Sequence, residues 1–207
     1  MCFSAEASFG AGLVCSAIGA MSLRIANKKD LLIAAIPLLF GIQQIIEGFV
    51  WLFEGKGFGY FSGFIFITIA FCFWTIYIPI ATFVSETDKV KQNLMLLLLP
   101  FGLYLSSYGA YSLSFPLRID LSTNQIQYIL SVPSSVFLEY LYSTVVLAPL
   151  FLMKNLYLKL FGASVLIFFI VSTLFFNPAR FSVWCFFAAL SSILIFLAVH
   201  QKKFSHI

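Results

Sequence analysis

Residues 36–51 read IPLLFGIQQIIEGFVW, an apolar stretch interrupted only by Gln43, Gln44 and Glu47. A charge at the centre of a membrane helix costs about 3 kcal/mol on insertion scales. Ionisable residues in such helices therefore usually face a protein interior and carry function. Because positions i, i+1 and i+4 lie near one face of a helix, these three side chains are predicted to project together.

The composition excludes a soluble domain. The chain has 207 residues, of which 61% are hydrophobic and 10% are charged, whereas soluble domains carry about 25% charged residues. Residues 1–207 are predicted to form a single all-α transmembrane domain, with the lipid bilayer as its surrounding partner. The net charge of +4 comes from basic residues scattered at helix ends, so no nucleic-acid partner is expected.

Seven apolar runs approach the length of about 20 residues that crosses a bilayer core. Short polar segments separate most of them, which predicts a bundle of seven transmembrane helices. The predicted spans are Ser4–Leu23, Leu31–Phe53, Tyr60–Val84, Gln92–Tyr111, Ser135–Met153, Leu156–Phe176 and Phe181–His200.

The basic residues predict the orientation, because cytoplasmic loops carry an excess of Lys and Arg. Three basic residues fall on one side of the predicted bundle, namely Lys56, Arg118 and Arg180. Nine fall on the other, namely Arg24, Lys28, Lys29, Lys89, Lys91, Lys154, Lys159, Lys202 and Lys203. The N-terminus is therefore predicted outside and the C-terminus in the cytoplasm, which agrees with an odd number of spans.

The longest connection lies between the fourth and fifth spans, on the predicted outer side. Residues 118–128 alternate apolar and polar around a Ser-Thr-Asn turn, a pattern typical of a short β-hairpin. An isolated hairpin is marginal in water, so it is expected to lie on the outer mouth of the bundle. An irregular loop is the alternative.

Three of the eight acidic residues lie inside predicted spans at a similar depth. At a rise of 1.5 Å per residue, Glu47 lies about 24 Å along a helix that starts near Leu31. Glu6 and Glu139 lie near the outer ends of their helices. The hypothesis is an outward-facing polar site lined by Glu6, Gln43, Gln44, Glu47, Glu139, Arg180 and Trp184. Arg180 is a suitable counter-charge for a buried glutamate. The alternative is that these groups join helices or extend to the headgroups.

Cysteine chemistry is a separate possibility at the outer face. Removal of Met1 would leave Cys2 with a thiol and an α-amine, and a thiol beside a base can be a nucleophile. Cys185 is predicted at similar depth, so the two cysteines could form a disulfide or bind a soft metal. An inert terminal cysteine is the simpler alternative.

Other chemistries are excluded. Only two histidines occur, His200 and His206, both near the C-terminus, so a multi-histidine zinc site cannot be built. The chain contains no GxSxG elbow, Walker motif or HExxH motif. No metal-binding residues are predicted, the cofactor is left open, and an enzyme is the less favoured class.

Three motifs resemble a bacterial family of small multi-pass membrane proteins of unknown function. They are the N-terminal MCFSA-x-ASF at residues 1–9, QQ-x-x-EG-x-x-W at residues 43–51 and SVWCFFAA at residues 182–189. The resemblance covers the whole chain and implies the bacterial cytoplasmic membrane as location. It supplies no activity.

Three functional hypotheses remain. The first is a protein that binds or transports a cation, proton or small polar solute at the carboxylate–amide site. The second is a membrane-embedded enzyme or redox protein that uses Cys2. The third, a small receptor or sensor subunit, agrees with the topology but has no specific residue behind it.

Overall fold

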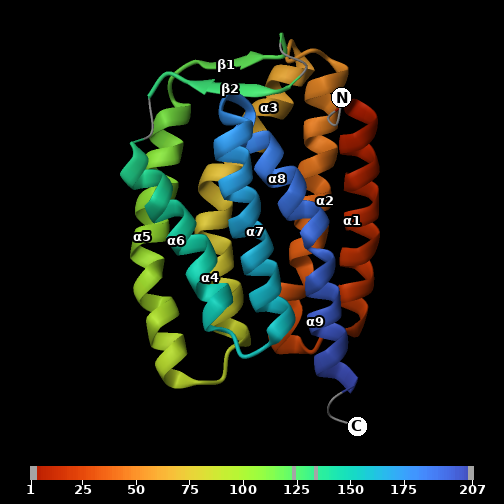
Figure 1. Cartoon of the computed structure of the whole chain (residues 1–207), viewed down its shortest axis with the longest axis vertical. Helices are drawn as coiled ribbons and strands as arrows, with labels where there is room; N and C mark the ends of the chain where they lie inside the picture. Colours follow the sequence, from red (N-terminus) through yellow and green to blue (C-terminus); the bar gives the residue numbers. More distant parts are fainter. Residues whose placement is uncertain (1–3, 123–124, 133–134, 205–207) are drawn as a thin grey trace.

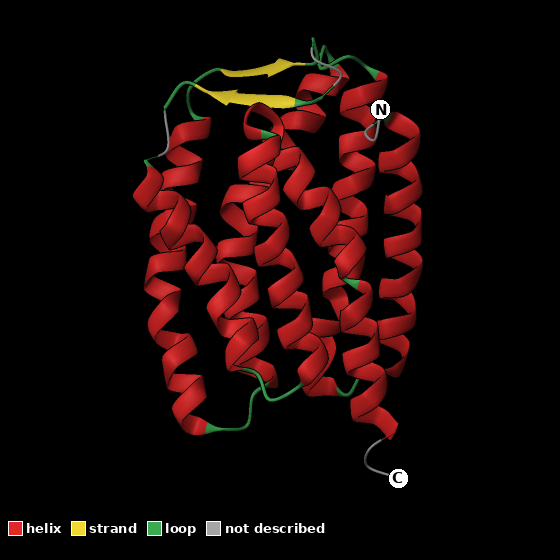
Figure 2. Cartoon of the chain, viewed as in Figure 1, coloured by secondary structure: helices red, strands yellow, loops and turns green. Residues whose placement is uncertain are grey.

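Helices running in alternating directions form a bundle capped at one end by two strands (Figure 1, Figure 2). This computed structural model describes residues 4–122, 125–132 and 135–204. A π-helical turn, η2 (Ile69–Phe73), joins α3 and α4 into one column, and α8 and α9 form another. The helices are α1 (Ala5–Ile25), α2 (Leu31–Leu52), α3 (Phe58–Thr68), α4 (Trp74–Ser85), α5 (Lys89–Leu113), α6 (Val136–Leu152), α7 (Leu156–Phe175), α8 (Arg180–Ser191) and α9 (Ile193–Phe204). The strands are β1 (Leu117–Asp120) and β2 (Gln127–Leu130).

Several helices begin at a side chain that accepts a hydrogen bond from the first turn. Ser4 accepts from the backbone N–H of Ala7 at 3.3 Å, and Asp88 accepts from Val90 at 3.0 Å. Asn155 caps α7 in the same way. Asp88 and Asn155 occupy breaks between the apolar runs, and capping satisfies N–H groups that have no partner inside the helix.

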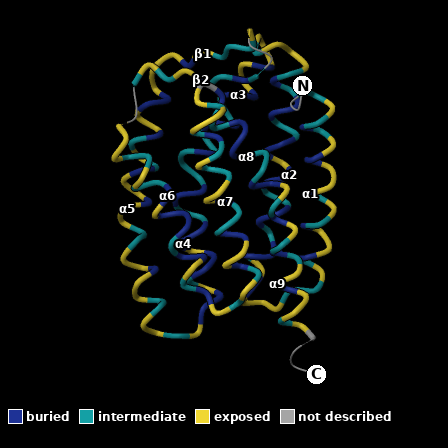
Figure 3. The backbone as a smooth tube through the Cα atoms, in the orientation of Figure 1, coloured by how far each residue is buried: buried dark blue, intermediate teal, exposed yellow. Residues whose placement is uncertain are grey.

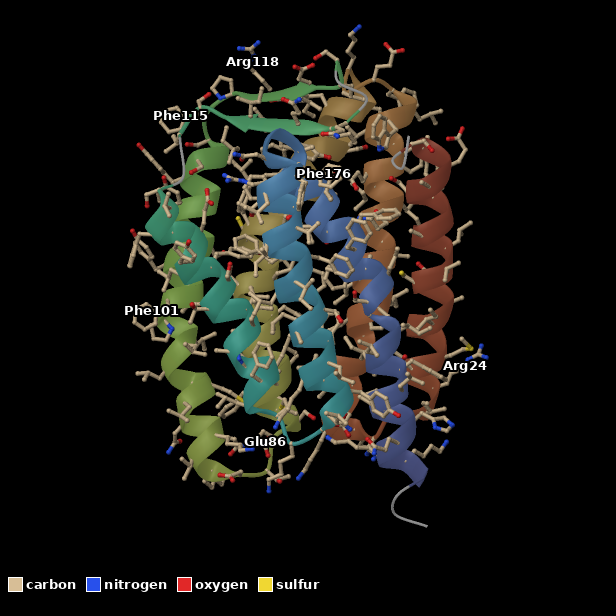
Figure 4. All side chains as sticks on the ribbon, in the orientation of Figure 1. Arg24, Glu86, Phe101, Phe115, Arg118 and Phe176 are labelled. Atoms are coloured by element: carbon tan, nitrogen blue, oxygen red, sulfur yellow. The ribbon has the colours of Figure 1, made fainter. Side chains whose placement is uncertain are left out.

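Six of the helical columns among the described residues are long and apolar enough to cross a membrane. The seventh, α6, has 17 residues, which at 1.5 Å per residue gives about 25 Å. α6 is therefore shorter than the span predicted there, Ser135–Met153. Large apolar side chains cover the outward face of α5, including Leu97 and Phe101, and Phe101 points away from the bundle (Figure 4). Such a surface is suited to contact with lipid.

Two predicted spans are interrupted. The third contains η2, where the hydroxyl of Tyr142 donates a 2.5 Å hydrogen bond to the carbonyl of Ala70. The seventh breaks at Ser192, whose hydroxyl donates to the carbonyl of Ala189 at 2.5 Å. The thiol of Cys15 donates to the same carbonyl at 3.2 Å. In both places a side chain donates a hydrogen bond to a backbone carbonyl at the irregular turn.

The predicted hairpin is confirmed. β1 and β2 pair antiparallel, with Ile119 opposite Tyr128 and Leu117 opposite Leu130. The strands lie across one end of the bundle (Figure 1). Tyr128 of β2 points inward and stacks on Phe66 of α3, with 5.2 Å between ring centroids. We call this the hairpin end of the bundle.

The opposite end, which we call the basic end, carries the nine basic residues predicted to share one side. Arg24 and Glu86 lie towards this end and Arg118 lies at the hairpin end (Figure 4). Asp30 is buried here and pairs with Lys202 of α9, with 2.7 Å between Oδ1 and Nζ. The hydroxyl of Ser85 also donates to Asp30. This cluster joins the start of α2, the end of α4 and the end of the chain's last helix.

The core follows the interior of the bundle, where buried positions lie, while exposed positions follow the outward faces (Figure 3). Phe40 of α2 stacks on Trp74 of α4 with 4.2 Å between ring centroids. Helices α1 and α2 approach closely at glycines: a Cβ on Gly41 would lie 2.6 Å from the backbone nitrogen of Ser16. Small residues of this kind are typical of contacts between membrane helices.

Candidate functional site

The three polar side chains of the α2 motif are fully enclosed. Gln43 and Gln44 are 0% exposed and Glu47 is 1% exposed. They project from the half of α2 nearer to the hairpin end. Burial of a carboxyl group and two amides in a helical bundle is costly unless partners satisfy them, so their hydrogen bonds decide what the site can do.

Gln43 is satisfied by residues of two other helices. Its amide oxygen accepts a 2.9 Å hydrogen bond from Nε1 of Trp74, and its amide nitrogen contacts the sulfur of Cys185 at 3.7 Å. Trp74 is on α4 and Cys185 is on α8. Gln43 therefore acts as a structural link between α2, α4 and α8.

Gln44 and Glu47 differ from Gln43, because both amide atoms of Gln44 and Oε1 of Glu47 are enclosed without hydrogen-bond partners among the described residues. The polar side chains that approach the Glu47 carboxyl are Ser182, Gln44 and Tyr128. Among the described residues, however, Oε1 of Glu47, both amide atoms of Gln44 and the Tyr128 hydroxyl make no hydrogen bond. We call Gln44, Glu47, Tyr128 and Ser182 the acidic site.

No described lysine or arginine forms an ion pair with Glu47. The acidic site thus has one titratable carboxyl group and several oxygen atoms with unused hydrogen-bonding capacity. Unsatisfied buried polar atoms are rare in native proteins, and each requires an explanation such as an ion or a catalytic role.

Tyr128 encloses the acidic site from the hairpin. Its ring is 6% exposed, and its position opposite Ile119 on β1 fixes the direction of the side chain. Burial raises the pKa of the Tyr128 hydroxyl well above its ordinary value, and the nearby Glu47 carboxylate acts in the same direction. Tyr128 therefore stays neutral over the physiological range and can offer its oxygen or its proton to a neighbour.

Glu139 and Arg180 form a second polar site on other helices. Oε1 of Glu139 on α6 lies 2.6 Å from Nη2 of Arg180 at the start of α8. The two side chains are 18% and 22% exposed, respectively. The pair lines a cleft together with Trp184 and Cys185. The indole N–H of Trp184 donates to the carbonyl of Val165 at 2.9 Å, so this donor is already used.

The seven predicted site residues thus do not surround one outward-facing cavity. Gln43, Gln44 and Glu47 are enclosed in the bundle, Glu139, Arg180 and Trp184 line the cleft, and Glu6 is exposed on the first turn of α1. The rise of a helix gives the position of a residue along it, whereas the direction in which its side chain points depends on how the helix packs. Cys185 links the two groups, since it contacts Gln43 and also lines the cleft.

Of the two cysteines in the cysteine hypothesis, the structure describes only Cys185. Cys2 lies outside the described residues, so its reactivity and any pairing with Cys185 stay predictions. Cys185 itself is a free buried thiol, 8% exposed. No group of three His, Cys, Asp or Glu side chains capable of holding a metal ion occurs among the residues that the structure describes.

Tyr128, Ser182 and Trp74 join the site without having been predicted as site residues. Tyr128 alternates with Gln127 and Ile129 along β2, and this period of two marks it as an inward position. Ser182 belongs to a motif whose Trp184 was predicted as a site residue. Trp74 had no signal of its own, because a tryptophan in a membrane helix is most often a packing residue.

The fold and site together define a class: a helical protein with membrane-spanning character and an enclosed acidic site. The whole chain, residues 1–207, matches the family described as Family of unknown function (DUF6629), and the protein belongs to that family. Neither the curated proteins nor the solved structures include a match to the chain.

Proposed function

We propose that this membrane protein binds a proton or a small cation at Glu47 and serves as a binding or transport protein for it. The observation that carries the proposal is the group of unpartnered polar atoms around an enclosed carboxyl group with no cationic side chain beside it.

The first step is charge compensation. An ionised carboxylate removed from water requires an opposite charge, or it takes up a proton and becomes neutral. No described side chain supplies that charge to Glu47. A bound proton or a bound cation is therefore the remaining way to stabilise the site.

The second step is the chemistry of the neighbours. Hard cations prefer oxygen ligands from carboxylates, amide carbonyls and similar groups. Glu47, Gln44 and Tyr128 each present an unpartnered oxygen, and Ser182 adds a hydroxyl at the same carboxyl. The same atoms could instead accept the proton of a neutral Glu47. Both possibilities use Glu47 as the residue that changes charge.

The third step concerns size. The cleft beside Glu139 is lined by Cys185 but not by Glu47 or Gln44. The acidic site is thus separate from that open volume, which favours a dehydrated ion or a proton over a larger polar solute.

For the orientation, we propose seven crossings, with the hairpin end outside and the basic end in the cytoplasm. The difference in basic residues between the two ends supports this orientation. α6 is compatible with a crossing, because 17 residues is at the lower limit for a transmembrane helix. The acidic site would then lie in the outer half of the bilayer, in the bacterial cytoplasmic membrane.

Thermal unfolding of the purified protein, with Glu47→Gln as the test variant, checks the proposal. A ligand that binds only the folded state stabilises it by about 1.4 kcal/mol at ten times its Kd. Wild-type protein should be stabilised in a saturable manner by Na⁺, Li⁺ or K⁺, or should show a pH-dependent melting temperature if the ligand is a proton.

Glu47→Gln should fold and lose this response, whereas Glu6→Gln, at an exposed position, should retain it. If Glu47→Gln responds to ions and pH as the wild type does, the proposal is wrong. A cation effect that weakens as the pH falls would indicate that the two ligands compete for the same carboxyl group.

A further inference from the structure

A second cleft, deeper in the bundle, adjoins the cleft beside Glu139. We call the first the hairpin-side cleft. The second, the inner cleft, shares Tyr142, Trp184 and Cys185 with the first. The two clefts therefore adjoin at these three side chains, and we call them together the groove.

The groove is long and apolar. Along α6 its lining extends from Leu138 to Leu150, which corresponds to about 18 Å at 1.5 Å per residue. A bilayer core of about 30 Å gives each leaflet about 15 Å of acyl chain. The groove is therefore about as long as the chain of one lipid. Its walls are largely aromatic and aliphatic, as in sites that bury apolar ligands.

The groove is polar at one end only. Glu139 and Arg180 lie at the hairpin end of the groove, and both are partly exposed. Trp184 lies one helical turn deeper on α8 and is 7% exposed. Exposure thus decreases from the charged pair inwards, so an entering ligand would keep its polar group at Arg180 and insert its apolar part.

Arg180 is suited to an anionic group. A guanidinium carries five N–H donors in a rigid fork that matches carboxylate and phosphate oxygens. The ion pair with Glu139 is made through Nη2, and the side chain is 22% exposed, so further anionic oxygens can approach the fork.

We propose that this groove binds one long-chain phospholipid, with its acyl chain along Trp184 and its anionic phosphate headgroup at Arg180. The groove is a site separate from the acidic site at Glu47, and its occupancy does not depend on the function proposed above. Arg180 would act as the residue that selects the headgroup.

Quenching of tryptophan fluorescence by brominated lipids tests this proposal on the full chain. Delipidated protein in neutral detergent is titrated with phosphatidylglycerol brominated on one chain, and with phosphatidylcholine brominated at the same position. We expect saturable quenching at a concentration at least ten-fold lower for the anionic lipid. Trp184→Phe should lose at least half of the saturable quenching.

The matched pair Arg180→Gln and Glu139→Gln separates headgroup binding from a structural role. Both variants break the same ion pair, so the loss of the pair itself is common to both. Arg180→Gln should lose the ten-fold preference, whereas Glu139→Gln and Arg180→Lys should keep it.

Equal behaviour of Arg180→Gln and Glu139→Gln would overturn the proposal. Quenching that is linear with lipid concentration, or unchanged in Trp184→Phe, would overturn it as well. If Arg180→Gln fails to fold, loss of the preference in folded Arg180→Lys would count against headgroup selection by charge.

Discussion

The indole nitrogen of Trp74 donates a 2.9 Å hydrogen bond to the amide oxygen of Gln43. This bond orients the amide, so that its nitrogen faces Cys185. The adjacent residue, Gln44, is equally buried but has no partner for either amide atom among the described residues. Two neighbouring glutamines therefore have different roles. Gln43 joins helices, whereas the amide atoms of Gln44 are available to bond a ligand.

Gln43→Leu should destabilise the protein by about 1–3 kcal/mol. The substitution leaves the buried N–H of Trp74 without an acceptor, and an unsatisfied buried donor costs about that much. The measurement is chemical or thermal unfolding in detergent, compared with wild type at the same detergent concentration.

Gln44→Leu is the matched control, and the opposite result is expected. It removes two polar atoms that have no partner, so stability should be unchanged or increased by up to about 1 kcal/mol. The response to cations or pH should weaken, because one oxygen beside Glu47 is lost. A cost equal to that of Gln43→Leu would contradict the distinction between the two glutamines.

Tyr128→Phe should reduce the loss of stability at alkaline pH. The folded-state pKa of Tyr128 lies above the ordinary value of 10.0. The neutral phenol therefore contributes fully to the free energy of unfolding below pH 10. This contribution is lost as the pH rises towards the folded-state pKa. Each unit of that shift corresponds to about 1.4 kcal/mol.

The measurement is the free energy of unfolding as a function of pH, from pH 8 to about 11.5. This range brackets the ordinary tyrosine pKa of about 10. Wild type should lose more stability across that range than Tyr128→Phe does. Tyr60→Phe, at an exposed position on α3, should follow the wild-type curve. Parallel curves for Tyr128→Phe and wild type would exclude a neutral, enclosed phenol.

Gly41→Ala should separate α1 from α2. A Cβ at this position would lie 2.6 Å from the backbone nitrogen of Ser16 and 2.8 Å from the carbonyl oxygen of Gly12. Backbone atoms cannot rotate away, so an overpacking cost of about 1–3 kcal/mol is expected. Gly10→Ala is the control, since nothing lies within 4 Å of its added Cβ and alanine has the higher helix propensity. Unfolding midpoints of the two variants should shift in opposite directions.

The helical class and the hairpin could be predicted from sequence because each follows from local periodicity or composition. The grouping of Glu6 and Glu139 with Glu47 could not. The rise of a helix gives the depth of a residue, but rotation about the helix axis depends on packing against neighbours. α1 turns Glu6 outward and α6 turns Glu139 towards Arg180.

The interruptions of the third and seventh spans were also beyond the sequence. η2 contains no glycine or proline, so no local signal marks the π-helical turn. The carbonyl of Ala70 bonds instead to the hydroxyl of Tyr142, a residue 72 positions away in the chain. A partner so distant in sequence appears only when the helices are packed.

Lys202→Gln should loosen the end of α9 from the basic end of the bundle. Nζ of Lys202 lies 2.7 Å from Oδ1 of Asp30, whose side chain is only 8% exposed. Removing the cation leaves a buried carboxylate with the Ser85 hydroxyl as its remaining described side-chain partner. Hydrogen bonds to charged groups contribute about 1.5–3 kcal/mol, and the partial exposure of Lys202 places the cost towards the lower value.

Asp30→Asn combined with Lys202→Gln should recover part of this loss, because the double variant leaves no unpaired charge. Lys28→Gln, at an exposed position in the same turn, should unfold as wild type does. Hydrogen exchange of the α9 amides is the most direct measurement, since it reports opening of this helix before the whole bundle unfolds. Unchanged α9 exchange in Lys202→Gln would mean that apolar packing alone holds the last helix in place.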